Sequence, residues 1–134
     1  MRYLLDTNAC ICYLRGSSAP LKQQVLALPT TSIVVCAVVK MELHYGAMKS
    51  QRPAESIARY QEFTVVFHSL PFDDAAAERC GEVRALLARL GKPIGPYDLQ
   101  IAAIALANQV TLVTHNTEEF SRVPGLLLED WETA

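Results

Sequence analysis

Apolar runs and helical periodicity alternate along the chain. Four apolar or β-branched runs predict buried strands at residues 2–5, 31–36, 64–70 and 110–116, and a last apolar run predicts an edge strand at residues 125–131. The segments between these runs carry helical apolar spacing or capping residues and predict helices at residues 7–16, 19–29, 37–50, 53–63, 72–91 and 99–109. Strands that alternate with helices indicate an α/β fold, in which a parallel sheet has helices on both faces.

Size and charge narrow the class of protein further. With 134 residues, 51% of them hydrophobic, the chain fits a single domain with a substantial core. A formal net charge of −2 argues against a protein that holds nucleic acid by an overall basic surface, although its 12 Lys and Arg residues can still form a local patch. The longest apolar runs, such as residues 33–39, are too short to span a bilayer, so we expect a soluble, cytoplasmic protein.

The four cysteines do not form a redox or zinc motif. Cys10 and Cys12 have C-x-C spacing rather than C-x-x-C, and Cys36 and Cys80 provide no second pair. We interpret all four as small apolar side chains in a reducing compartment.

Acidic side chains occur where a parallel sheet binds ligands, beyond the carboxyl ends of its strands. Asp6 directly follows the first predicted strand, and Asn116 follows the fourth. Pro96 suits the first position of a helix, which places Asp98 in the opening turn of that helix. Glu42 lies in an otherwise apolar helical stretch. We expect these residues to face the same edge of the sheet.

Each of these acids, taken alone, also fits an ordinary role. Asp6 can cap a helix, Asp98 can complement a helix dipole, and Glu42 can point to solvent. Together they are not explained by these separate roles, because neighbouring buried carboxylates repel each other. No Lys or Arg lies beside Asp6 or Asp98 in the sequence to compensate their charge. A hard divalent cation such as Mg²⁺ or Mn²⁺ takes oxygen ligands and would resolve this repulsion.

Four ordered motifs carry a resemblance to a known family. The segments "LLDTN", "MELHYGA", "IGPYDLQIAAIAL" and "LVTHNTEEF", followed by "RVPGLLLEDW", are similar to those of PIN-domain ribonucleases. Within that family, the chain most resembles the VapC toxins of bacterial VapBC toxin–antitoxin pairs. The resemblance spans nearly the whole chain. It implies a three-layer α/β/α PIN-like nuclease domain over residues 1–134, with a central sheet of four to five mainly parallel strands.

The resemblance also implies a catalytic, metal-binding acidic cluster formed by Asp6, Glu42 and Asp98. A fourth acid often follows the last core strand in this family, but the matching position here is the uncharged Asn116. Asn116 can still offer a neutral oxygen, and Glu119 can bind a cation through water. Both therefore stay open as the fourth contributor.

Residues beside this cluster are expected to orient it. Thr7, Asn8, Thr114 and Asn116 are candidates for hydrogen bonds to the carboxylates. The implied activity is Mg²⁺-dependent endoribonuclease cleavage, with Mn²⁺ as a substitute, in which Asp6 and Asp98 hold the ion and Glu42 completes the shell or orients the attacking water. The products would carry a 5′-phosphate and a 3′-hydroxyl, and no catalytic histidine is required.

The expected substrate is a structured RNA, whose loops expose unstacked bases. VapC proteins similar to this one cleave initiator tRNA in the anticodon loop, which is our substrate hypothesis. The basic candidates for phosphate contacts are Arg15, Lys40, Lys49, Arg84, Arg89 and Lys92. A solvated charged face is the alternative for any one of them.

The implied partners are a second copy of the chain, in a homodimer, and a VapB-type antitoxin in a higher-order complex. In this interpretation the antitoxin places an apolar helix in a groove and a basic residue in the acidic pocket. Residues 19–29 and 37–48 are apolar enough for such surfaces, although a buried core explains them equally well.

Other functions stay open at this point. An Asp-dependent phosphatase also begins with an apolar strand and an Asp, but it needs a second Asp two residues later, where this chain has Asn8. A receiver-like signalling domain lacks its paired acids here. A non-catalytic module of the same fold that binds RNA or protein is the third alternative.

Overall fold

Five parallel strands form the centre of the molecule. The computed structural model describes residues 1–133. Its sheet has the order β3-β2-β1-β4-β5, and every neighbouring pair of strands is parallel. The strands are β1 (Tyr3–Leu5), β2 (Ile33–Cys36), β3 (His68–Leu70), β4 (Thr111–Val113) and β5 (Leu128–Glu129). The predicted parallel sheet of four to five strands is therefore confirmed.

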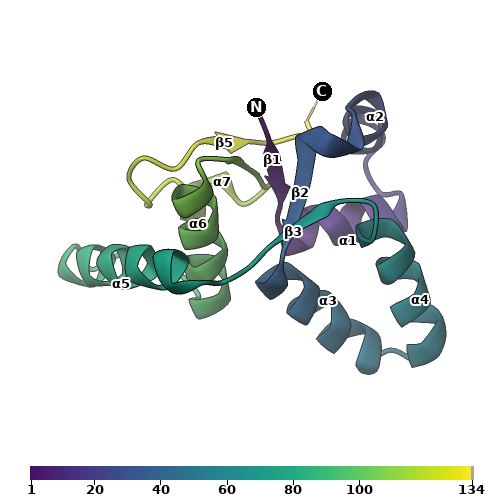
Figure 1. The fold of residues 1–134 in the computed structure, drawn as a ribbon, viewed down its shortest axis with the longest axis horizontal. Helices are drawn as coiled ribbons and strands as arrows, with labels where there is room; N and C mark the ends of the chain where they lie inside the picture. The colour runs from purple at the N-terminus through teal and green to yellow at the C-terminus, as the bar shows by residue number, and fades with distance from the viewer. Residues whose placement is uncertain (134) are drawn as a thin grey trace.

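Helices cover both faces of this sheet. They are α1 (Thr7–Arg15), α2 (Ala19–Ala27), α3 (Ala37–Met48), α4 (Pro53–Thr64), α5 (Asp74–Arg89), α6 (Pro96–Asn108) and the short α7 (Thr117–Phe120), with a 3₁₀ turn at Thr30–Ser32. Figure 1 shows α5 and α6 on one side of the strands and α1, α2 and α4 on the other. The three-layer arrangement predicted from the sequence is therefore confirmed. No helix within residues 1–133 combines the length and the apolar character needed to cross a membrane.

The third strand begins later than predicted. Residues 64–70 were expected to form it, but α4 continues through Thr64 and β3 starts only at His68. Val65 and Val66 lie in the turn between them, with 76% and 56% of their surfaces exposed. Their β-branched side chains favour a strand by local preference. At these positions, however, the chain lies between the end of α4 and the start of β3 and does not pair with the sheet.

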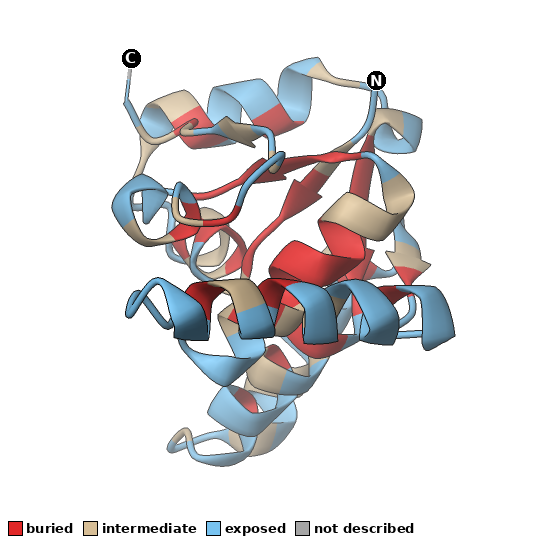
Figure 2. Cartoon of the chain, turned by 90° about the vertical axis from the view of Figure 1, so that its left-hand side faces the viewer, coloured by how far each residue is buried: buried red, intermediate tan, exposed pale blue. Residues whose placement is uncertain are grey.

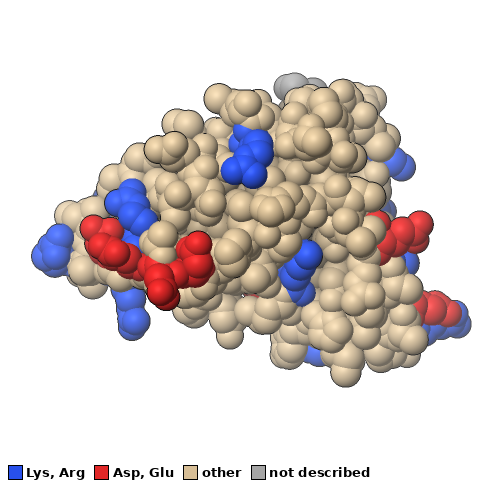
Figure 3. All heavy atoms as spheres, viewed as in Figure 1, with Lys and Arg blue, Asp and Glu red and all other residues tan. Residues whose placement is uncertain are grey.

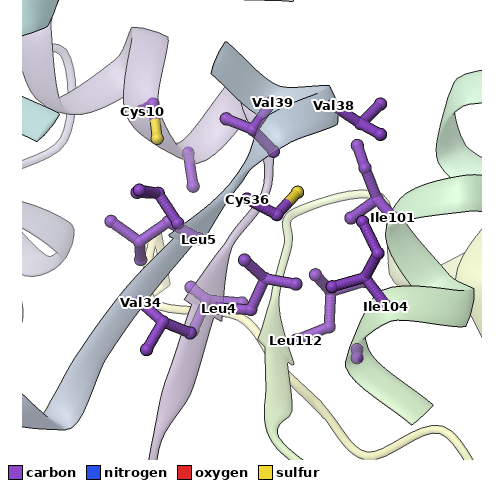
Figure 4. Packing of buried hydrophobic residues seen from close by; sticks show 14 of the residues in the cluster. Leu4, Leu5, Cys10, Val34, Cys36, Val38, Val39, Ile101, Ile104 and Leu112 are labelled. Carbon is purple, nitrogen blue, oxygen red and sulfur yellow. The ribbon is translucent and has the colours of Figure 1, made fainter. Parts of the chain in front are cut away.

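The core lies against the inner strands on both faces. Successive side chains of a strand point to opposite faces, so Leu4 and Leu5 serve different layers. Figure 4 shows Leu4 beside Leu112 of β4 and Ile104 of α6, whereas Leu5 lies toward Cys10 of α1. Figure 2 shows these strands buried between helices whose outward faces are exposed. Helices therefore pack on both faces of the sheet and hold the carboxyl ends of its strands in place.

Substitution of Leu112 by Ala tests this account of the core. Leu112 is fully buried, so the Leu112→Ala protein should lose about 2–5 kcal/mol of unfolding free energy, through lost burial and the cavity left behind. Leu127→Ala is the control, because 60% of Leu127 is exposed and its truncation should change stability by no more than about 0.5 kcal/mol. Urea denaturation measures both, and equal losses would show that β4 is not a core strand.

Candidate metal centre

Asp6 is the only residue between β1 and α1, and it is almost completely buried. Its carboxylate caps α1, because the Ala9 N–H donates to Asp6 Oδ1 at 2.7 Å. Burial raises the pKa of Asp6 to about 6, against hydrogen bonds from Thr114 and Ala9 that lower it, and the charge of Asp98 raises it further. One cap does not compensate this carboxylate for its lost hydration.

Asp98 lies in the first turn of α6, as the position of Pro96 predicted. Partial burial is the main cause that raises the pKa of Asp98 to about 6, followed by the negative charges of Glu119 and Glu42. Together with the effect of Asp98 on Asp6, these interactions link four carboxylates, one from the β1–α1 junction and one each from α3, α6 and α7. The acids that are dispersed in the sequence therefore converge at the carboxyl edge of the sheet.

Glu42 is half-buried on α3 and held by a neighbour from another helix. The Thr7 hydroxyl donates to Glu42 Oε1 at 2.6 Å, although 35 residues separate the two in sequence. Thr7 immediately follows Asp6, so one short segment both caps α1 with a carboxylate and orients a second carboxylate. Asn8, the next residue, is exposed beside the cluster.

Asn116 and Glu119 form one unit at the start of α7. The Asn116 side-chain amide donates to Glu119 Oε2 at 2.8 Å, and the Gly95 N–H donates to Glu119 Oε1 at 3.1 Å. These two hydrogen bonds lower the pKa of Glu119. The Asn116 N–H in turn donates to Thr114 Oγ1 at 3.0 Å. Asn116 is thus hydrogen-bonded to Glu119, whose charge acts on Asp98.

The carboxylates are close but not in mutual contact. In residues 1–133, the acidic or histidine side chains whose ligand atoms all lie within 4.8 Å of one another are His115, Asp130 and Glu132, and not the predicted triad. Magnesium usually keeps several waters and takes one or two protein carboxylates together with substrate phosphate. The three acids of the triad offer only oxygen donors, which suit a hard cation of this kind.

Two histidines are occupied by partners outside this triad. His44 Nδ1 lies 2.6 Å from the Tyr60 hydroxyl, and His115 Nδ1 lies 2.9 Å from Asp130 Oδ2. The hydrogen bond to Asp130 raises the pKa of His115, which is exposed. The sequence offered no sign of this pair, because Asp130 lies 15 residues away, beyond the last strand.

The predicted RNA-contacting residues are spread over several surfaces. Arg15 is exposed at the end of α1 and borders a hollow that Glu42 also lines. Arg84 and Arg89 are exposed on α5, Lys92 follows that helix, and Lys40 is half-buried on α3. Figure 3 shows basic and acidic side chains interspersed over α5 on this face, without a continuous basic patch. Lys49, the sixth candidate, is exposed just after α3, and its Nζ lies 4.5 Å from the centre of the Tyr45 ring. Of the six, Arg15 is the one that lines a hollow together with an acid of the triad.

Comparison with known proteins agrees with this geometry. The PIN domain family matches residues 3–126. A protein of Shigella flexneri named tRNA(fMet)-specific endonuclease VapC is 40% identical over 98% of both chains. The structure of DNA-bound VapBC from Salmonella typhimurium superposes with a TM-score of 0.92 at 37% identity, over 98% of both chains. VapBC2 from Rickettsia felis, bound to promoter DNA, gives a TM-score of 0.90 at 33% identity, over 98% of this chain and 99% of that one.

This breadth of similarity identifies the class of protein. The chain belongs to the PIN-domain family, as one of its VapC ribonucleases. The family resemblance predicted from the four motifs is thereby confirmed. PIN-domain nucleases generally depend on divalent metal ions, in agreement with the oxygen-rich donor set at the sheet edge. The alternative of an Asp-dependent phosphatase gains no support from these relatives.

The raised pKa of Asp6 predicts a pH-dependent stability in metal-free protein. Because its folded pKa of about 6 exceeds the ordinary 3.8, the stabilising contribution is complete below pH 4 and is lost as pH rises through about 6. Asp6→Asn keeps a capping oxygen but carries no charge. At pH 8 this variant should unfold with a free energy higher than that of the original chain, by on the order of 2–3 kcal/mol, and the gain should shrink toward pH 4.

Denaturation in EDTA at both pH values measures this effect. Asp73→Asn is the matched control, because Asp73 caps α5 by accepting from the Ala76 N–H but lies on the surface. It should show no comparable gain at pH 8. An Asp6→Asn protein that is less stable than the original chain at pH 8 would contradict the account of Asp6.

Proposed function

We propose that this protein is the toxin of a type II toxin–antitoxin system, a Mg²⁺-dependent endoribonuclease that acts in the cytoplasm and inhibits translation and growth. The observation that carries the proposal is the convergence of Asp6, Glu42 and Asp98 at the carboxyl edge of the sheet in a VapC chain. Residues 1–134 act as one nuclease domain in this proposal.

Asp6 and Asp98 would hold the ion, and Glu42 completes the site. Burial penalises the ionised form of Asp6, so a cation at this edge removes a cost that the chain alone does not offset. When bound, Mg²⁺, or Mn²⁺ in its place, lowers the pKa of a coordinated water and neutralises charge on a phosphate. Glu119 is the nearest further acid, and Asn116 and Gly95 hold it in a fixed orientation.

The chain's own residues then direct hydrolysis. Glu42, oriented by the Thr7 hydroxyl, accepts a proton from the attacking water. The water oxygen bonds to phosphorus as the bond to the 3′-oxygen breaks, and the departing 3′-oxygen takes a proton from solvent. The products are a 5′-phosphate and a 3′-hydroxyl. Thr114 hydrogen-bonds Asp6, and Asn8 is exposed two residues after it.

Initiator tRNA is the proposed substrate. The relative from Shigella flexneri and one from Salmonella typhimurium, 40% and 37% identical to this chain, are both named tRNA(fMet)-specific endonucleases. An anticodon loop presents unstacked bases and a flexible backbone, which an open acidic edge can reach without unwinding a helix.

A VapB-type antitoxin is the proposed partner, seated in an apolar groove. A groove of about 550 Å³ lies between α1, α2 and α4 and is lined by Leu26, Phe63 and Val66 among others. Leu26 and Val66 are 66% and 56% exposed, which is costly for a chain without a partner. Several relatives of known structure are VapBC complexes, some of them bound to DNA. An amphipathic helix fits such a groove and would build the higher-order complex.

A homodimer is proposed through α3. Met41, Tyr45 and Met48 are spaced by four and three residues along this helix, so they share one face, and all are exposed. A second copy of the same face would cover them.

The metal mechanism predicts a graded loss of activity. Asp6→Asn and Asp98→Asn should abolish Mg²⁺-dependent tRNA cleavage and growth inhibition, because each removes a charged ligand. Thr7→Val should lower activity by roughly 10–100-fold, since Glu42 loses the group that orients it. Asn116→Ala should have a smaller effect than Asp6→Asn. Mapping of the RNA ends after brief induction, with EDTA and Mn²⁺ reactions alongside, measures these effects.

Circular dichroism and thermal denaturation are the folding controls for these variants. Cleavage retained by both Asp variants would end the metal hypothesis. RNA binding by folded, nuclease-free protein that never cuts in Mg²⁺ or Mn²⁺ would select the non-catalytic alternative instead.

The proposed dimer predicts a change of mass. Tyr45→Glu should convert the free protein to a monomer, because it places a charge at the centre of the apolar α3 face. Val65→Glu is the control, as Val65 is 76% exposed in the turn after α4 and away from α3. Light scattering measures both masses, and a Tyr45→Glu protein with the mass of the original dimer would exclude this face.

A further inference from the structure

Two arginines border the hollow that opens onto Glu42. This hollow, of about 230 Å³, lies between α1, α3 and α4, and its walls include Arg15, Arg59, Ser56 and Tyr60 in addition to Glu42. Arg15 comes from the last turn of α1 and Arg59 from the middle of α4. Arg15 was a candidate from the sequence, whereas nothing in the sequence distinguished Arg59.

A second hollow lies on the other side of α1. It has a volume of about 390 Å³ and is bordered by Asn8 and Asn116, which flank the acidic cluster. Arg15 and Ile11 line both hollows, so they meet at the outer face of α1. Arg15 is therefore accessible from both hollows, one of which contains Glu42.

Arg59 is held in place by the backbone of α1. Its Nη2 donates to the Leu14 carbonyl oxygen at 2.6 Å, at the end of the helix where carbonyls lack intrahelical partners. A guanidinium has five N–H groups, so this bond leaves donors available. The contact orients Arg59 and reduces the entropy lost when a ligand binds.

Neither arginine is neutralised within residues 1–133. Arg52, the residue just before α4, pairs with Glu55 at 3.4 Å, and Arg79 on α5 pairs with Glu82 at 3.7 Å. No carboxylate of the described residues lies within 4 Å of the Arg15 or Arg59 guanidinium. Two exposed, unpaired guanidinium groups thus lie next to an acidic site on a protein of net charge −2.

We propose that Arg15 and Arg59 form a phosphate-binding pair that holds the RNA backbone beside the scissile phosphate. The inference rests on the proposed ribonuclease function and adds its substrate-binding residues. An acidic edge repels RNA, so binding needs local positive charge along the strand. Guanidinium groups match phosphate oxygens in bidentate geometry, and such contacts set the register of the strand without reading its bases.

RNA binding in the absence of cleavage tests the pair. In an Asp6→Asn background, Arg15→Gln and Arg59→Gln should each weaken binding of a labelled anticodon stem-loop RNA by roughly tenfold at low salt. Each should also reduce the slope of log K against log[salt] by about 0.7–1, the loss expected for one phosphate contact. Glutamine removes the charge of Arg59 and is too short to keep the bond from Nη2 to the Leu14 carbonyl, so the stability of this variant is measured beside its RNA affinity.

Arg52→Gln in the same background is the matched control. It removes the arginine that immediately precedes α4 and is already paired with Glu55, and should leave both affinity and slope unchanged. Thermal denaturation of all variants separates loss of binding from loss of fold. Arg15→Gln and Arg59→Gln proteins that are folded and bind RNA as Arg52→Gln does would overturn the inference.

Cleavage by the chain with Asp6 intact separates this inference from the proposed function. If that chain cuts tRNA in Mg²⁺ and the two arginine variants raise KM with kcat nearly unchanged, the pair positions substrate. If it cuts tRNA while the arginine variants lose only antitoxin binding, the pair belongs to a protein interface and the inference fails. If it does not cut at all, the proposed function fails, and the binding assay still judges the arginine pair independently.

Discussion

Electrostatic repulsion between carboxylates is the constraint around which this molecule is organised. Asp6 and Asp98 both have pKa values raised to about 6, because burial and neighbouring acids disfavour their ionised forms. A fold normally avoids such an arrangement unless something compensates the charge. In the proposed function, a divalent cation bound at this edge would supply the compensating positive charge. The rigid sheet holds the acids together in the meantime.

Hydrogen-bond donors around the acids hold the carboxylates in place despite their mutual repulsion. The Ala9 N–H donates to Asp6, the Thr7 hydroxyl donates to Glu42, and the Asn116 amide and the Gly95 N–H donate to Glu119. None of these donors is a formal cation, so they orient the carboxylates without cancelling their charge. The negative charge of the acids therefore stays available to a cation, whereas a lysine in the same place would neutralise it.

The sequence predicted those parts of the fold and site that follow local rules. The alternation of elements predicted the parallel sheet, and the carboxyl-end rule predicted where Asp6 and Asp98 would lie. It predicted that Thr7 would hydrogen-bond a carboxylate of the cluster, but not that Glu42 would be the acceptor, because that contact depends on how α1 and α3 pack. The sequence did not indicate a role for Arg59 for the same reason, because that role depends on the contact of Arg59 with the end of α1. The error at Val65 likewise reflects tertiary position overriding local preference.

The junction between β1 and α1 has a consequence for how this family can vary. One residue, Asp6, turns the chain from sheet to helix, so the junction has no slack. Inserting a single residue there would rotate the helix by about 100° relative to the strand. The hydrogen bond from Thr7 to Glu42 would then be broken, and Asp6 would no longer cap α1. Length variation among relatives is therefore expected in the connections that lead to α5 and β5, with the β1–α1 corner of invariant length.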